Sequence, residues 1–79
     1  MQNYSVKVVK LNAEADSTLL GVKLGRVCIA AGVPVQQVSH TLNVSKSVVY
    51  KWFTGRGEVG KHLREKVEAY YRSVPPTAA

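Results

Sequence analysis

Two short stretches with helical spacing of apolar residues, 34–42 and 45–54, are separated by only two residues. Pro34 suits the first turn of a helix, because its missing N–H costs no hydrogen bond there. Ser45 is a good N-cap for the second stretch. Asn43, in the connection, tolerates a left-handed backbone better than any residue except glycine. Helices joined by so short a turn must cross steeply, and this crossing is the strongest constraint on the fold.

A steep crossing has its own residue requirements. A small residue is needed where the helices approach most closely, and Ser39 is the candidate. Apolar side chains must fill the space between the helices, and the spacing predicts that they are Val38, Leu42, Val44, Val49 and Trp52. Trp52 is therefore expected in the core. The alternative, a stacking platform for single-stranded nucleic acid, is disfavoured by its helical phase.

Residues that start and stop helices predict one further helix on each side of this pair. Asp16 or Ser17 can cap a helix that ends at Gly32. A last helix is predicted over 59–73, because two prolines follow it. Residues 75–79 are expected to form a disordered tail.

The N-terminal segment, residues 4–11, has a different pattern. Tyr4, Val6 and Val8 alternate with other side chains and are β-branched or aromatic, which predicts a short strand. A mobile tail is an equal alternative, because a single strand has no partner in this chain. A strand here would have to pair with a second copy. We therefore expect an all-α domain of four to five helices, with the chain divided into an arm or strand (1–16), a helical domain (17–74) and a tail (75–79).

The charge distribution favours a polyanionic partner. Eleven Lys and Arg residues against five Asp and Glu give a formal net charge of +6. No acidic residue lies between Asp16 and Glu58. That stretch carries Lys23, Arg26, Lys46, Lys51 and Arg56. The central segment is therefore the candidate surface for a polyanion.

The remaining chemistry-bearing residues argue against catalysis. Cys28 is the only cysteine and has apolar neighbours, which predicts a buried thiol and excludes an intramolecular disulfide or a multi-Cys zinc site. His40 and His62 have no metal-spaced partner, and Ser45 and Ser47 have no activating histidine at sensible spacing. We expect no enzyme, metal or cofactor. The start lacks the apolar core of a signal peptide and no apolar run spans a bilayer, so a cytoplasmic protein without a membrane partner is expected.

Residues 32–55, GVPVQQVSHTLNVSKSVVYKWFTG, resemble the lambda-repressor-like family, which includes phage repressors and Cro proteins. They satisfy the pattern G-[LV]-x-x-x-x-[LV]-[AS]-x-x-[LV]-[GN]-V-S-x-x-x-[IV]-x-x-W-x-x-G, and the likeness extends more loosely over 19–72. The resemblance implies a helix-turn-helix domain that binds double-stranded operator DNA as a homodimer. It further implies a transcriptional regulator, a repressor of a phage or mobile element that acts in the host bacterial cytoplasm.

The resemblance also implies which side chains contact DNA. The second motif helix would enter the major groove and expose Ser45, Lys46, Ser47, Tyr50 and Lys51. Base contacts would fall mainly to Lys46, Ser47 and Lys51. Phosphate contacts would fall to Gln36 at the start of the first motif helix, and to Arg56 and Lys61 after the second.

This sequence departs from the family at three places. The mildest is Asn43, which replaces the usual turn glycine. Pro34 and Val35 stand where members commonly have Ser or Thr followed by Gln. Cys28 and Phe53 occupy positions where some phage repressors bury an Arg–Glu pair, so an apolar contact is expected between them. Helical phase also places Phe53 on the inner side, toward the helix that carries Cys28.

Two alternative functions and two dimer surfaces stay open at this point. A helix-turn-helix scaffold could serve a small phage adaptor that binds a host protein or RNA, or an excisionase-like architectural DNA-binding factor. Two copies could associate through the strand predicted over Tyr4 to Leu11, or through the Tyr70–Tyr71 end of the last helix. The strand is slightly favoured, because its valines have no obvious partner inside one chain.

Overall fold

The computed structural model describes residues 4–74, and these residues form five helices without a strand. The helices are α1 (Val6–Glu14), α2 (Leu20–Ala31), α3 (Val35–Leu42), α4 (Lys46–Phe53) and α5 (Lys61–Ser73). The expected all-α domain is confirmed. None of the helices described is long and apolar enough to cross a membrane. The tail predicted over 75–79 lies outside the described residues.

The predicted N-terminal strand is wrong, because this segment forms α1. Ser5 caps the helix, its hydroxyl accepting a hydrogen bond from the Val8 N–H at 3.3 Å. Val8 and Val9 pack partly buried against the core, whereas Val6 is 80% exposed. A helix can bury one face on α2 and α4 within the same chain, whereas a lone strand has no ladder to join. Tertiary packing therefore overrides the β-branched pattern.

Polar side chains fasten α1 to the rest of the domain. Asn12 is buried, and its amide donates hydrogen bonds to the carbonyl oxygens of Val22 at 3.2 Å and Phe53 at 2.7 Å. The Arg26 guanidinium donates to the carbonyl oxygens of Asn12, Ala13 and Ala15 at the end of α1. The Arg26 bonds reach carbonyl oxygens in the last turn of α1 and at its C-cap, where a helix lacks part of its own donors. The first helix is thus a fixed part of the domain.

The connection between α3 and α4 has the predicted backbone. Asn43 is left-handed, with φ 56°, and is the C-cap of α3. The Ser45 hydroxyl accepts a hydrogen bond from the Val48 N–H at 3.2 Å, which confirms it as the N-cap of α4. Gly32 is also left-handed and ends α2 as predicted, whereas Pro34 lies one residue before the first residue of α3.

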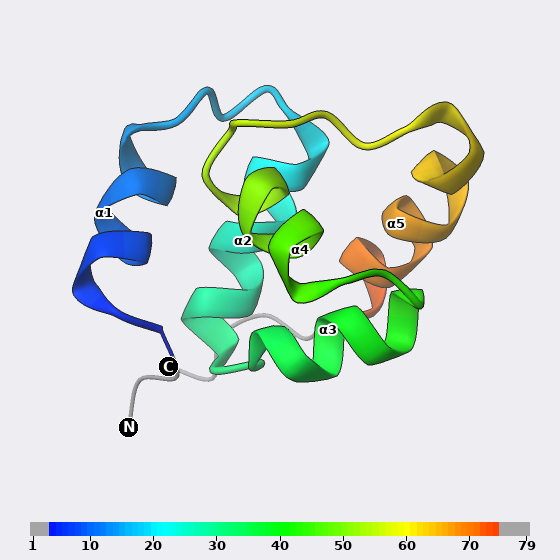
Figure 1. Cartoon of the computed structure of the whole chain (residues 1–79), viewed down its shortest axis with the longest axis horizontal. Helices are drawn as coiled ribbons and strands as arrows, with labels where there is room; N and C mark the ends of the chain where they lie inside the picture. The colour runs from blue at the N-terminus through cyan, green and yellow to red at the C-terminus, as the bar shows by residue number, and fades with distance from the viewer. Residues whose placement is uncertain (1–3, 75–79) are drawn as a thin grey trace.

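Helices α2 and α4 lie at the centre of the domain, with α1 on one side and α5 on the other (Figure 1). Trp52 is 3% exposed, which confirms it as a core residue. Phe53 is fully buried and contributes with Cys28 to one apolar cluster. It packs on α2 at Gly25, where a Cβ atom would lie 2.9 Å from the Phe53 Cγ. The expected packing of Phe53 toward this helix is confirmed.

Cys28 is expected to be unreactive as long as the domain is folded. It is completely buried, and desolvation raises the pKa of its thiol to about 12. Because the thiolate is the nucleophile and the raised pKa keeps the thiol protonated near pH 8, iodoacetamide should label the folded protein far more slowly than the protein unfolded in denaturant. Mass spectrometry of timed samples measures both rates. Comparable rates in the two states would contradict the buried position.

Candidate functional site

Helix α4 has one buried and one exposed side. Val49, Trp52 and Phe53 are buried, and the residues on the other side are open to solvent. Residues one turn apart share a helix face, so 46, 47, 50 and 51 form one exposed strip. All eight residues expected to contact DNA are exposed: Gln36, Ser45, Lys46, Ser47, Tyr50, Lys51, Arg56 and Lys61. Tyr50 is 41% exposed and is a large apolar side chain on an otherwise polar strip.

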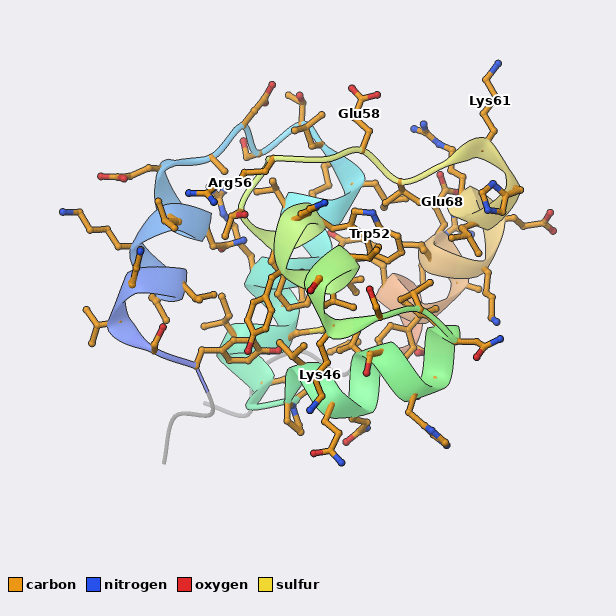
Figure 2. All side chains as sticks on the ribbon, viewed as in Figure 1. Lys46, Trp52, Arg56, Glu58, Lys61 and Glu68 are labelled. Carbon is orange, nitrogen blue, oxygen red and sulfur yellow. The ribbon has the colours of Figure 1, made fainter. Side chains whose placement is uncertain are left out.

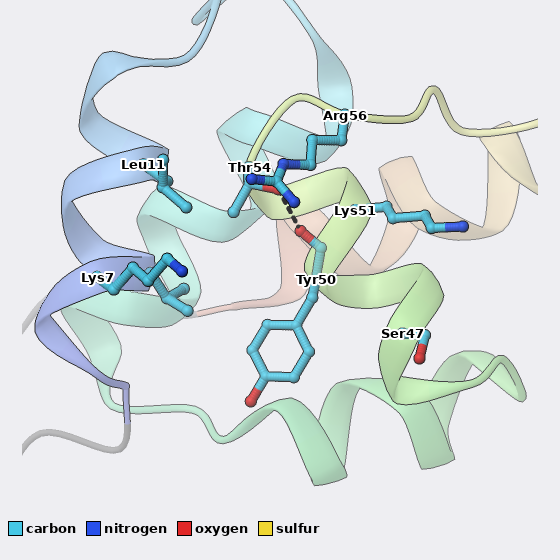
Figure 3. Close-up of a pocket in the computed structure, with 8 residues that line it drawn as sticks. Lys7, Leu11, Ser47, Tyr50, Lys51, Thr54 and Arg56 are labelled. Atoms are coloured by element: carbon cyan, nitrogen blue, oxygen red, sulfur yellow. Dashed lines mark hydrogen bonds between the residues drawn. The ribbon is translucent and has the colours of Figure 1, made fainter.

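A groove of about 430 Å³ lies beside this strip, between α1 and α4 (Figure 3). Helix α1 lines it with Lys7, Val8 and Leu11. The opposite wall consists of Ser47, Tyr50, Lys51, Thr54 and Arg56, from α4 and the turn that follows it. The structure therefore brings together four of the eight predicted residues. It adds Lys7, which the sequence alone does not distinguish from a lysine that is merely solvated.

Three cations of the groove differ in where they point. Figure 3 shows Lys7 directed from α1 toward α4, and Arg56 lying across the C-terminal end of α4. Lys51 extends from α4 in the direction away from α1, so that it lines the groove with only part of its side chain. Lys7 and Arg56 thus flank the groove, whereas the Lys51 ammonium lies on the outer side of α4.

The turn after α4 fixes the backbone that carries Arg56. The N–H groups of Arg56 and Gly57 donate to the Lys51 carbonyl oxygen at 2.9 and 3.2 Å. Gly55 has a positive φ of 75°, and a Cβ there would lie 3.1 Å from the Ala15 Cβ. The left-handed backbone and this close approach both favour glycine. The backbone of Arg56 therefore has a well-defined position.

Two predicted residues lie away from the groove. Gln36, on α3, lines a separate surface hollow with Pro34, Gln37 and His40. Lys61 begins α5 at the margin of the domain, far from Lys46 in the view of Figure 2. Of the three residues predicted to contact phosphates, Arg56 lines the groove beside the α4 strip, whereas Gln36 and Lys61 do not line it.

The groove is positively charged. None of the residues that line it is acidic. Within residues 4–74, the ion pair found is Arg64–Glu68 on α5, so Lys7, Lys51 and Arg56 have no carboxylate partner in that part of the chain. The same part of the chain has no group of three or more His, Cys, Asp or Glu side chains that could hold a metal ion. The site offers hydrogen-bond donors and positive charge, which suits an anionic ligand.

Comparison of the chain with protein-family models, with curated proteins and with solved structures found no match in any of the three. The molecule is therefore defined by its own features. It is an all-helical domain with a cationic groove and an exposed polar helix face beside it.

Proposed function

We propose that this protein binds double-stranded DNA in a sequence-specific manner and regulates transcription, with α4 in the major groove. The observation that carries the proposal is the two-sidedness of α4. Its inner side is held in the core by Trp52 and Phe53, and its outer side presents Lys46, Ser47 and Lys51. A buried inner side gives a rigid helix, and the outer side provides donors for guanine O6 and N7.

The dimensions and the setting of α4 support this function. A helix with its side chains is about 10–12 Å wide, and the major groove of B-DNA is about 12 Å wide. A short turn at Asn43 connects α3 to α4, and the two helices pack on each other. This order matches a helix-turn-helix motif, in which the second helix reads the bases and the first helix crosses the backbone. The motif likeness of residues 32–55 supports a repressor of the phage or mobile-element type.

The proposal assigns different roles to the exposed residues. Lys46, Ser47 and Lys51 contact base edges, with Ser45 and Tyr50 beside them in the major groove of the DNA. Gln36, Arg56 and Lys61 contact phosphates, which position the protein without reading sequence. Gln36 lines a separate hollow on α3 and Lys61 begins α5, so both would touch the backbone outside the α1–α4 groove.

We propose that two copies bind together, because a single α4 of eight residues covers too little DNA to select a site. The structure removes one of the two surfaces expected for this contact, since residues 6–14 form a helix and cannot add a strand across a two-fold axis. The end of α5 with Tyr70 and Tyr71 is left as the dimer surface. Both rings are partly exposed at the edge of the core.

Selection of bound sequences from a pool of random duplexes tests the function. We expect an enriched site with two half-sites of opposite orientation, about one helical turn apart. Sedimentation of the protein on that site should give two protein chains for each duplex. A protein that enriches no sequence, or that binds its site as a monomer, would contradict the corresponding part of the proposal.

The two rival functions give different results in the same assays. An adaptor would bind a protein or an RNA tightly and show no affinity for duplex DNA. An architectural factor would bend duplexes measurably but enrich sequences weakly. Strong enrichment of a two-fold symmetric site separates the proposed regulator from both.

A further inference from the structure

We propose that Lys7 and Arg56 form a phosphate-binding pair that holds one DNA strand along the α1–α4 groove. Helix α1 then belongs to the DNA interface, on the flank of the helix that reads the bases. This inference rests on the proposed function and adds a second contact element to it. It concerns a residue, Lys7, to which the sequence assigned no role.

The lining of the groove matches the chemistry of a DNA strand. Lys7 and Arg56 flank it from two elements far apart in the sequence, and Val8 and Leu11 supply apolar surface together with the Tyr50 ring (Figure 3). A DNA strand alternates charged phosphates with deoxyribose rings that present carbon atoms. Cations on the rim suit the phosphates, and the apolar lining suits the sugars. The groove is open, as a contact with a long polymer requires.

Both cations are held on fixed backbone. Helix α1 is fastened by the buried Asn12 amide and by Arg26, so that Lys7 projects from a rigid helix. Arg56 lies in the turn whose N–H groups donate to the Lys51 carbonyl oxygen. A phosphate contact from such positions loses little conformational freedom on binding compared with one from a loose arm. Neither cation has an ion-pair partner among residues 4–74, so neither has to be released before DNA binds.

Lys10 offers a matched control for Lys7. Both lysines are exposed on α1, and both carry the same charge on the same side chain. Lys7 lines the groove, whereas Lys10 does not. Lys7→Gln and Lys10→Gln therefore change the net charge equally and differ in the proposed contact alone.

The experiment measures binding of both variants, and of the unchanged protein, to the selected duplex and to a scrambled duplex at several salt concentrations. Lys7→Gln should weaken binding to both duplexes equally and lower the slope of log K against log salt by about one. The ratio of the unchanged protein's binding constant to that of Lys7→Gln should therefore shrink about fourfold when the salt concentration rises fourfold. The double variant Lys7→Gln/Arg56→Ala should lower the slope by about two, and Lys10→Gln should leave it unchanged.

The outcomes separate this inference from the function beneath it. If the unchanged protein binds no duplex, the proposed function and this inference fall together. If it binds duplex DNA but Lys7→Gln and Lys10→Gln have the same slope, the inference alone is wrong. A circular dichroism melt of each variant should match that of the unchanged protein, because Lys7, Lys10 and Arg56 are all exposed. Matching melts show that the slopes compare folded proteins.

Discussion

Replacement of Phe53 by alanine is expected to destabilise the domain by about 3–5 kcal/mol. Phe53 is the largest completely buried side chain, lies against Gly25 of α2, and has its ring centroid 6.0 Å from that of Tyr4. The Phe53 carbonyl oxygen also accepts the Asn12 amide at 2.7 Å, which holds the backbone at this position. For a domain this short, a loss of that size consumes most of the stability.

Thermal unfolding followed by circular dichroism measures this effect. Tyr50→Ala is the matched control, because it removes an aromatic ring from the same helix at a position that is 41% exposed. The control should melt close to the unchanged protein, whereas Phe53→Ala should be largely unfolded at moderate temperature. A melting temperature of Phe53→Ala within a few degrees of the unchanged protein would contradict the central position given to this residue.

The central half of the fold could be predicted from the sequence because its signals are local. Asn43 needs only its own backbone preference to mark a turn, and Ser45 needs only the N–H of Val48 to cap a helix. Helical spacing then assigns Val49 and Trp52 to the core. Each inference uses residues within one or two turns of one another.

The first helix could not be predicted in the same way, since what stabilises it is remote in sequence. The Asn12 amide is bonded to Val22 and Phe53, ten and forty-one residues away along the chain. Tyr4 is buried beside Phe53, and its hydroxyl donates to the Val33 carbonyl oxygen. No local pattern in residues 4–11 reports these partners. The valines at 6, 8 and 9 therefore predicted a strand, although Ser5 caps a helix in the structure.

The candidate site was predictable in its exposure but not in its grouping. Helical phase is sufficient to place Lys46, Ser47 and Lys51 on the outer side of α4. The position of Lys7 depends on how α1 packs, and the separation of Lys61 from the α4 strip depends on the path of residues 54–60. Both positions are set by tertiary packing. A charge count alone treats all of these lysines as equivalent.

Lys51→Ala is expected to cost about 1–3 kcal/mol in binding to the selected site, with relaxed preference at one base position. Lys51 lies one turn beyond Ser47 on the exposed side of α4, and its side chain extends away from the α1–α4 groove (Figure 3). A lysine there can reach guanine O6 and N7. Arg56 lies past the end of the helix, so Arg56→Ala should weaken binding to all sequences alike and lower the salt slope by about one.

The contrast between these two variants tests whether α4 reads sequence or only holds DNA. Each variant is titrated against the selected site, a set of single-base variants of that site, and a scrambled duplex. For Lys51→Ala, the affinity loss should be large on the selected site and small on the scrambled duplex, because a base contact exists only where the correct base is present. Equal losses on both duplexes would make Lys51 a phosphate contact. The bases would then have to be read by Lys46 and Ser47, in the first turn of α4.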